Sequence, residues 1–234
     1  MKALLLAAGR GTRLGKITEF IPKPLVKINN RPVIDYLIRK LINLDVTNII
    51  INTHYKNSLI EEFVKSMKYN VELSLFYEPE LLGTAGTLKK HIDILSTDDF
   101  IVMHADNYFQ DDLRNLKKTH LLDKSRYLLT MGTFVVSDPT KFGTVLLSED
   151  ETVVGYLEKE KNSPSKIANS AVYFMRPEIK NEINKLNSYE RDISINLLPK
   201  LVGKMKACSL QGYFYDIGTP DNLLLADSLA ISLD

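Results

Sequence analysis

The amino-acid sequence predicts an α/β protein, with a mixed, mostly parallel sheet, helices on both of its faces and a small β-rich lobe. Two observations predict this class. Short apolar or β-branched runs alternate with longer amphipathic segments through the first half of the chain, as in parallel sheets covered by helices. After about Arg126 strand patterns follow one another with turns between them, so the second half extends the sheet and adds the lobe.

The first half contains four strand patterns, each followed by a helical one. The strands are predicted at residues 2–7, 48–53, 71–77 and 100–104. The helices are predicted at 32–44, with Pro32 in the first turn, at 58–68, with Ser58 as the cap, and at 84–95 and 111–122. This order is Rossmann-like. In such sheets ligands bind beyond the carboxyl ends of the strands.

The second half is richer in strands. They are predicted at residues 127–136, 143–147, 152–158, 167–175, 205–210 and 213–216, and one turn between them is the SEDE segment, residues 148–151. Helices are predicted at 177–186, at 192–202 and from Pro220. The sequence contains no linker or repeat, so we expect a single domain over residues 1–234.

Composition limits the compartment and the partners. Thirty basic and 29 acidic residues give a formal charge of +1, which provides no general attraction to nucleic acid or to an anionic membrane. Cys208 is the single cysteine, which excludes an internal disulfide and a cysteine-cluster zinc site and suits a reducing cytoplasm. The apolar start ends at Ala8, too early for a signal peptide, and no run approaches the ~18 apolar residues of a membrane span. We expect a cytoplasmic protein with small-molecule partners.

The segment from Leu4 to Leu25 has the character of a phosphate loop, because an apolar strand runs into a glycine turn that is followed by cations. Neither common phosphate-binding motif fits. The pattern GxxxxGK[ST] would need a glycine at Arg10, and GxGxxG would need one at Leu14. What remains is a loop whose glycines let backbone N–H groups approach an anion. Arg13 and Lys23 follow this loop and could bind the same anion. The alternative is that both are ordinary surface cations.

Two isolated aspartates, Asp106 and Asp216, each close an apolar strand pattern. A parallel sheet can bring both carboxylates to one edge, and Mg²⁺ is commonly held by one or two carboxylates together with phosphate oxygens and water. Taken alone, each aspartate is better explained as a turn former or a helix cap.

Six motifs in order then resemble one family. They are LAAGRGTRL with PKPL, LGTAGT, HADN, EK, ANSAVYF and YFYDIGTPDNL. Together they resemble the sugar-1-phosphate nucleotidylyltransferases over residues 1 to about 226. The resemblance implies that an NTP and a sugar 1-phosphate give an NDP-sugar and pyrophosphate with Mg²⁺. It also implies a nucleotide-binding part at about residues 1–125 and a sugar-phosphate-binding part that covers the substrate at about 126–234.

The resemblance also implies roles for single residues. Arg13 would act on the departing pyrophosphate and Lys23 at the α-phosphate, while Asp106 and Asp216 would hold Mg²⁺. The nucleotide would lie against Ala7, Ala8, Gly9, Gly11, Thr12, Gly83, Thr84 and Gly86. The sugar phosphate would be bound by Asn107, Glu158, Lys159 and Asn169. The LGTAGT loop favours GTP, with a hexose or heptose 1-phosphate.

The sequence departs from the family pattern in two places. Residues 15–20 lack the usual proline-leucine-threonine run, and His104 stands where a small residue is common. His104 either approaches the nucleotide or packs in the core. A carboxyl-terminal β-helix, with acyltransfer and a trimer, is not expected because the sequence ends at Asp234, and a homodimer stays open.

Other classes of protein compete with this interpretation. A glycosyltransferase that consumes nucleotide sugars commonly has an Asp-x-Asp turn, which this sequence lacks. A catalytically silent nucleotide-sugar-binding regulator would be expected to have lost Arg13, Lys23 or one of the aspartates. A nicotinamide dehydrogenase is not favoured, because Leu14 stands where the GxGxxG motif needs its third glycine.

Overall fold

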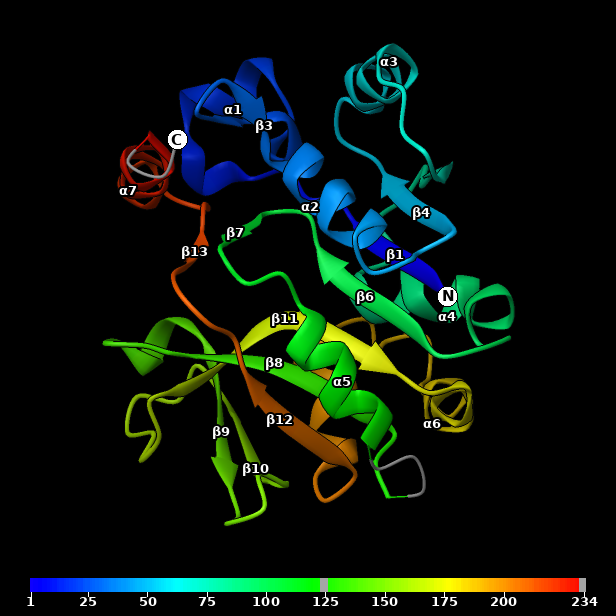
Figure 1. Cartoon of the computed structure of the whole chain (residues 1–234), viewed down its shortest axis with the longest axis vertical. Coiled ribbons are helices and arrows are strands. Elements are labelled where there is room, and N and C mark those ends of the chain that lie inside the picture. The colour runs from blue at the N-terminus through cyan, green and yellow to red at the C-terminus, as the bar shows by residue number, and fades with distance from the viewer. Residues whose placement is uncertain (123–125, 232–234) are drawn as a thin grey trace. The chain divides into compact units, whose positions relative to one another are not determined.

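The computed structural model describes residues 1–122 and 126–231 and confirms the α/β class with its mixed central sheet (Figure 1). The chain divides into two compact units. The loop unit consists of Lys2–Leu81, Met103–Asp112 and the chain from Gly212 onward. The mixed-sheet unit consists of Leu82–Val102 and Leu113–Gln211, with Met1. Strand β6 (Phe100–His104) begins in the mixed-sheet unit and ends in the loop unit. The single domain with parts at 1–125 and 126–234 stays a prediction.

The loop unit is built on parallel strands in the order β1-β4-β5. These are β1 (Lys2–Leu6), β4 (Asn48–Thr53) and β5 (Glu72–Tyr77). Leu4 lies opposite Ile50, which lies opposite Ser74. Ile49 and Ile51 are fully buried, as expected of parallel strands that are covered on both faces and therefore have continuous apolar runs.

The helices of the loop unit are α1 (Lys16–Phe20), α2 (Val33–Ile42), α3 (Asn57–Ser66) and α7 (Pro220–Ile231). α2 buries an apolar stripe at helical spacing, made of Val33, Ile34, Leu37, Ile38 and Leu41. The predicted cap of α3 at Ser58 is wrong. The helix begins one residue earlier, after Lys56 in a left-handed conformation, and no side chain caps it.

Short elements of the loop unit were not predicted. They are η1 (Thr12–Leu14), η2 (Lys23–Leu25), β2 (Lys27–Ile28), β3 (Arg31–Pro32) and β7 (Asn107–Phe109), and β7 pairs with the predicted β13 (Phe214–Asp216). Asn29 and Asn30 join β2 to β3 with φ of 44° and 60°, the conformation that two-residue hairpin turns require. Asp227 of α7 accepts a hydrogen bond from the Asn29 N–H at 2.6 Å, which anchors α7 to this hairpin.

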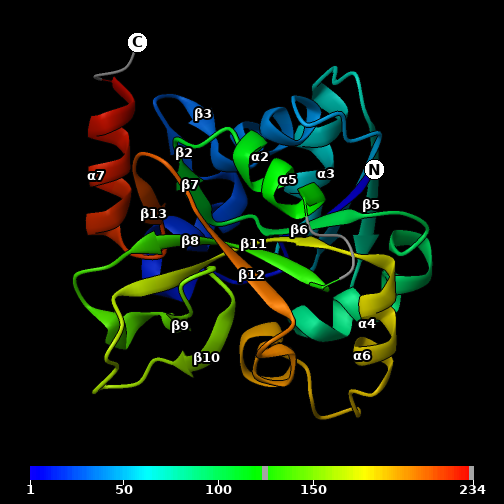
Figure 2. The ribbon, with the colours of Figure 1, turned by 60° about the horizontal axis from the view of Figure 1, so that its bottom comes forward.

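The mixed-sheet unit is mainly antiparallel (Figure 2). β11 (Ile167–Met175) pairs antiparallel with β8 (Leu129–Val135) and β9 (Gly143–Leu147). β9 also pairs with β10 (Val153–Glu158), while β12 (Met205–Ser209) runs parallel to β8. Its helices are α4 (Thr84–Leu95), α5 (Arg114–Leu122) and α6 (Lys180–Asn184), with short turns η3 (Pro139–Lys141) and η4 (Pro177–Ile179).

The prediction of a regular helix at residues 192–202 is wrong. This segment forms a π-helical turn, η5 (Ile193–Leu197), and then a 3-10 turn, η6 (Leu198–Leu201). The Asp192 carboxylate accepts a hydrogen bond from the Ile195 N–H at 3.0 Å and starts the first turn. Pro199 has no N–H to continue a regular helix.

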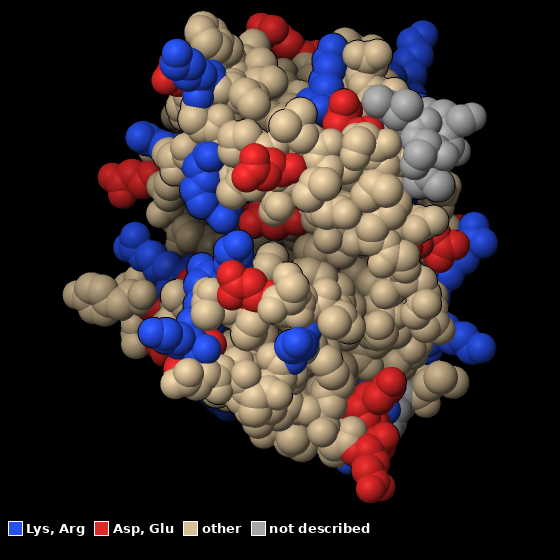
Figure 3. Space-filling view, turned by 90° about the vertical axis from the view of Figure 1, so that its left-hand side faces the viewer, with Lys and Arg blue, Asp and Glu red and all other residues tan. Residues whose placement is uncertain are grey.

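Within residues 1–122 and 126–231, no helix combines the length and the apolar character that crossing a membrane requires. On the face drawn in Figure 3, basic and acidic side chains are interspersed. This agrees with the small net charge of the sequence.

Candidate active site

The glycine loop after β1 is held by the side chain of Thr18. The Thr18 hydroxyl lies 3.1 Å from the carbonyl oxygens of both Gly11 and Gly15. Gly11 has a φ of +67°, and a Cβ there would lie 2.9 Å from Lys23 Cβ. The loop therefore requires glycine at this position for both its conformation and its close packing.

The beginning of the loop is held by hydrogen bonds to buried side chains. The Ala7 N–H donates to Asn52 Oδ1 at 2.7 Å, and Asn52 Nδ2 donates to Glu78 Oε1 at 2.8 Å. Asn52 and Glu78 are buried, so this polar chain is stabilised by its own hydrogen bonds. Ala7 and Ala8 are also buried. Their methyl side chains cannot form hydrogen bonds, so only their backbone groups could bind a ligand through them.

Lys23 joins the two aspartates. Its Nζ lies 2.7 Å from Asp106 Oδ2 and 2.9 Å from Asp216 Oδ1. The Lys23 side chain is only 6% exposed, whereas those of Asp106 and Asp216 are 34% and 21% exposed. Lys23 opens η2 between Pro22 and Pro24, with the Leu25 N–H bonded to the Pro22 carbonyl. A fixed, buried cation thus stands between two carboxylates that solvent still reaches.

The two aspartates meet by a route that differs from the expected one. Asp216 does not end a strand of the parallel sheet. It lies on β13, which pairs antiparallel with β7 and places Asp216 opposite Asn107. The Ile217 N–H also donates to the Asp106 carbonyl at 3.2 Å. The convergence therefore depends on a small separate ribbon.

The Asp216 carboxylate is held from both sides. The Gly218 N–H donates to Oδ1 at 2.9 Å, and Arg13 Nη2 lies 3.1 Å from Oδ2. A Cβ at Gly218 would lie 2.7 Å from Arg13 Nη2. The Asp216 carbonyl also accepts a hydrogen bond from Asn222 Nδ2 at 2.7 Å, so the first turn of α7 fixes the backbone here.

The electrostatics keep Asp106 ionised. Burial raises the pKa of the Asp106 carboxyl, but the charges of Lys23 and His104 and the hydrogen bond from Lys23 outweigh this effect and leave the pKa below its ordinary value. His104 Nε2 is buried and has no hydrogen-bond partner among the described residues.

The donor set suits a hard divalent cation. Two carboxylates converge on one cationic atom, Lys23 Nζ, so one small cation can contact both. This is the ligand type and number that Mg²⁺ takes when phosphates and water supply the rest. Within residues 1–122 and 126–231, no group of three or more His, Cys, Asp or Glu side chains could hold a metal ion.

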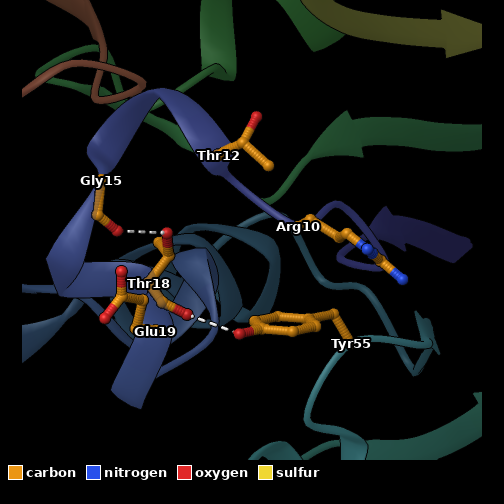
Figure 4. A pocket seen from close by; sticks show the side chains of 6 residues that line it. All are labelled: Arg10, Thr12, Gly15, Thr18, Glu19 and Tyr55. Carbon is orange, nitrogen blue, oxygen red and sulfur yellow. Dashed lines mark hydrogen bonds between the residues drawn. The ribbon is translucent and has the colours of Figure 1, made fainter.

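A cavity of about 270 Å³ lies beside the glycine loop (Figure 4). Tyr55 forms one wall, and its hydroxyl donates to the Thr18 carbonyl at 2.8 Å. Arg10 and Thr12 of the loop form another part of the lining, and Glu19 of α1 contributes a carboxylate. The lining thus combines one guanidinium, one carboxylate, hydroxyls and an aromatic ring.

The LGTAGT loop lies in the mixed-sheet unit and packs on residues 191–193. A Cβ at Gly83 would lie 2.4 Å from the Arg191 carbonyl oxygen. The Thr84 hydroxyl accepts a hydrogen bond from the Ile193 N–H at 2.8 Å, and the Ala85 N–H donates to the Arg191 carbonyl at 2.8 Å. Gly86 packs against Leu82. Glycine at 83 is therefore explained by packing, apart from any ligand.

Three of the predicted sugar-phosphate residues also belong to the mixed-sheet unit. Glu158 ends β10 and Lys159 follows it, with Lys159 Nζ 3.7 Å from Glu158 Oε1. Asn169 lies on β11 and is largely buried. The fourth, Asn107, is buried on β7 in the loop unit. Glu158 and Lys159 retain exposure for a ligand, whereas Asn107 and Asn169 are mostly enclosed by protein.

Sequence reasoning missed several residues of this region. They are Arg10, Thr18, Glu19, Tyr55 and Gly218. One signal was available for Thr18, since a threonine three residues after a loop glycine can bond back to its carbonyl. Tyr55 acts through Thr18, which is distant in the sequence, so no local pattern contains this contact. Gly218 acts through Asp216, two residues away.

Fold and site together define an α/β protein with a glycine loop, two converging carboxylates and fixed cations. The family model described as nucleotidyl transferase matches residues 2–231. Mannose-1-phosphate guanyltransferase of Saccharomyces cerevisiae is 31% identical over 96% of this chain and 63% of its own length. D-glycero-alpha-D-manno-heptose 1-phosphate guanylyltransferase of Campylobacter jejuni is 30% identical over 95% of this chain and 96% of its own.

Solved structures agree with these relatives. A putative glucose-1-phosphate thymidylyltransferase from Bacillus anthracis superposes with a TM-score of 0.88 at 25% identity, over 100% of this chain and 96% of that chain. The chain belongs to the nucleotidyl transferase family, and the resemblance to the sugar-1-phosphate nucleotidylyltransferases is confirmed. It spans a little under two thirds of the yeast enzyme, at 63%.

Proposed function

We propose that this chain is a Mg²⁺-dependent sugar-1-phosphate nucleotidylyltransferase of nucleotide-sugar biosynthesis. It condenses an NTP with a sugar 1-phosphate to give an NDP-sugar and pyrophosphate. The observation that carries the proposal is the buried Lys23 ammonium between Asp106 and Asp216, with Arg13 on the second carboxylate. Family membership supports the same reaction.

The chemistry needs no dedicated base. An oxygen of the sugar phosphate attacks the α-phosphorus, a new P–O bond forms, and the P–O bond to pyrophosphate breaks with its electrons leaving on pyrophosphate. A phosphate monoester has a second pKa of about 6, so the attacking group is already mostly a dianion at neutral pH. What remains is to align two anions and to neutralise charge on the leaving group.

The cations of the loop unit match these tasks. Lys23 is buried and held by two carboxylates, so its charge is fixed in place before the reaction, as transition-state stabilisation requires. We assign it to the α-phosphate. Arg13 has a side chain that is 66% exposed and can follow the departing pyrophosphate, to which we assign it.

Asp106 and Asp216 would hold the magnesium ion. Bound there, Mg²⁺ would neutralise phosphate charge and orient the phosphate chain. The partial exposure of both carboxylates leaves room for phosphate oxygens and water as further ligands.

The cavity beside the glycine loop provides space for the outer phosphates of the NTP. Arg10 and Thr12 supply a cation and a hydroxyl there, together with the backbone of Gly9 and Gly11. Ala7 and Ala8 lead into this loop from β1. Gly83, Thr84 and Gly86 would border the base. Asn107, Glu158, Lys159 and Asn169 would bind the sugar phosphate.

GTP is the favoured nucleotide. Two relatives are named as guanylyltransferases of mannose 1-phosphate and heptose 1-phosphate, whereas a similar structure is titled a thymidylyltransferase. We therefore propose GTP with a hexose or heptose 1-phosphate. The single cysteine fits a cytoplasmic location.

Pyrophosphate release tests the proposal. The protein is mixed with Mg²⁺, each of the four NTPs and mannose, glucose or heptose 1-phosphate, and Lys23→Met serves as the matched inactive variant. The proposal requires pyrophosphate and NDP-sugar in equal amounts from at least one pair. A glycosyltransferase would instead release NDP from a nucleotide sugar, and a silent regulator would bind without turnover.

A further inference from the structure

A partly buried polar cluster surrounds Glu158 in the mixed-sheet unit. Tyr156 and Glu158 lie two residues apart on β10, so their side chains share one face of the strand. The Tyr156 hydroxyl donates to Glu158 Oε2 at 2.8 Å. The Glu158 side chain is 25% exposed. One oxygen of a ligand-accessible carboxylate is therefore tied to the protein.

The Tyr156 hydroxyl remains a donor throughout the physiological range. Burial, and then the neighbouring Tyr173 and Glu158, raise the pKa of Tyr156 above its ordinary value. The hydroxyl therefore keeps its proton at neutral pH and can donate to Glu158.

Gly143 makes this arrangement possible. It lies opposite Glu158 in the β9–β10 pairing. A Cβ at Gly143 would lie 2.0 Å from the Tyr156 hydroxyl oxygen and 2.6 Å from Glu158 Oε2. Any larger residue would displace the pair, so the glycine, the hydroxyl and the carboxylate form one packed unit.

A second strand supports the cluster. Asn169 Nδ2 donates to the Tyr173 hydroxyl at 2.7 Å and lies 3.5 Å from that of Tyr156, while its Oδ1 accepts from the Ala171 N–H at 2.9 Å. The pairing of β11 with β8 is irregular between Asn169 and Tyr173, and Ala171 has a φ of 55°. Bulges and left-handed residues of this kind gather at functional sites.

We propose that Tyr156 is a positioning residue that fixes the Glu158 carboxylate for a hydroxyl group of the sugar 1-phosphate. With Oε2 held by Tyr156, the carboxylate presents Oε1 at a set angle, and this angle selects which sugar hydroxyl is bound. Asn169 acts through the tyrosines. The inference rests on the proposed function, because it names the group that recognises the sugar of that reaction.

The test is a mutant cycle with the sugar 1-phosphate that gives the fastest turnover among mannose, glucose and heptose 1-phosphates. Tyr156→Phe removes only the hydroxyl. It is expected to raise KM for the sugar phosphate about tenfold, the effect of a lost hydrogen bond to a charged group, and to leave KM for the NTP unchanged. In a Glu158→Ala background, which removes the acceptor, the same substitution is expected to change KM less than twofold.

Two controls keep the test specific. Tyr127→Phe removes another buried hydroxyl of the same unit, one that lies 2.7 Å from Thr152 Oγ1, and is expected to leave both KM values unchanged. Replacing Tyr156 by p-aminophenylalanine keeps a donor and is expected to restore most of the affinity. It also serves as the folded variant for comparison if Tyr156→Phe lowers the melting temperature strongly.

The possible outcomes separate the two claims. A wild-type protein that turns over no sugar phosphate overturns the proposed function and this inference with it. An active wild type with an unchanged KM in Tyr156→Phe overturns the positioning role alone. So does a tenfold rise that persists in the Glu158→Ala background, because Tyr156 would then act independently of the side chain at 158.

Discussion

A Cβ atom on Gly11 would lie 2.9 Å from the Cβ atom of Lys23. The loop that we assign to the triphosphate and the lysine that we assign to the α-phosphate are therefore packed against each other without space for a methyl group. The geometry of the loop and the position of the buried cation cannot vary independently.

Gly11→Ala is expected to lower both stability and turnover. The left-handed φ of +67° costs an alanine about 1–2 kcal/mol, and the contact with Lys23 adds strain. Gly9→Ala is the matched control, because a Cβ there meets nothing within 4 Å. Urea unfolding of both variants measures the difference. Equal free energies of unfolding would show that the loop tolerates a side chain at 11.

Removing the positive charge of Arg10 and removing the negative charge of Glu19 should shift the KM for the NTP in opposite directions. Arg10 and Glu19 both line it and both are exposed. If the outer phosphates lie there, Arg10→Gln raises KM for the NTP and Glu19→Gln lowers it, each by about two- to fivefold as exposed charges do. Initial rates at varied NTP concentration measure this. Shifts in the same direction would remove the phosphates from the cavity.

The buried carboxylate of Asp35 should stabilise the loop unit. Arg39 Nε lies 2.8 Å from Asp35 Oδ2, and the Tyr69 hydroxyl donates to Asp35 Oδ1. Tyr69→Phe is expected to lower the free energy of unfolding by about 1–2 kcal/mol, since a buried charged acceptor loses a donor. The exposed pair of Lys65 and Glu61 gives the control, because Lys65→Met should change it by less than about 0.5 kcal/mol. Similar losses in both would contradict the assignment.

Asp150 should make stability depend on acid pH. Hydrogen bonds from Ser148 and Thr152, and then from Arg126, hold the pKa of Asp150 below its ordinary 3.8. A depressed pKa adds stability above pH 3.8 that is lost as the pH falls through the folded-state value. The difference in free energy of unfolding between the protein and Asp150→Asn should therefore shrink between about pH 5 and about pH 2. Urea titrations that give a constant difference would refute this.

The sequence predicted elements whose pattern is local. The bounds of β4, α4, β6, β9 and β11 agree with the predicted residue ranges, because apolar runs mark the strands and a glycine precedes the helix. Asp106 and Asp216 were chosen on a local signal of the same kind, since each follows an apolar strand pattern, and their role in metal binding stays a prediction.

Elements that depend on distant partners could not be predicted. α1 is held by Tyr55, whose hydroxyl reaches the Thr18 carbonyl, and β7 exists through its pairing with β13. Residues 192–202 have a helical pattern, but Asp192 and Pro199 divide them into two short turns. The hydrogen bond from the Tyr156 hydroxyl to Glu158 could not be predicted either. It depends on the absence of a side chain at Gly143, which lies on another strand.

Turnover of Asp106→Asn tests the central claim most directly. The substitution keeps the size of the side chain and removes the charge that faces Lys23 and that we assign to magnesium. The account predicts a fall in kcat of about 10²-fold or more, with an unchanged circular dichroism spectrum and a raised requirement for Mg²⁺. Near-normal turnover by a folded Asp106→Asn protein, at the Mg²⁺ concentration that saturates the wild type, would contradict it.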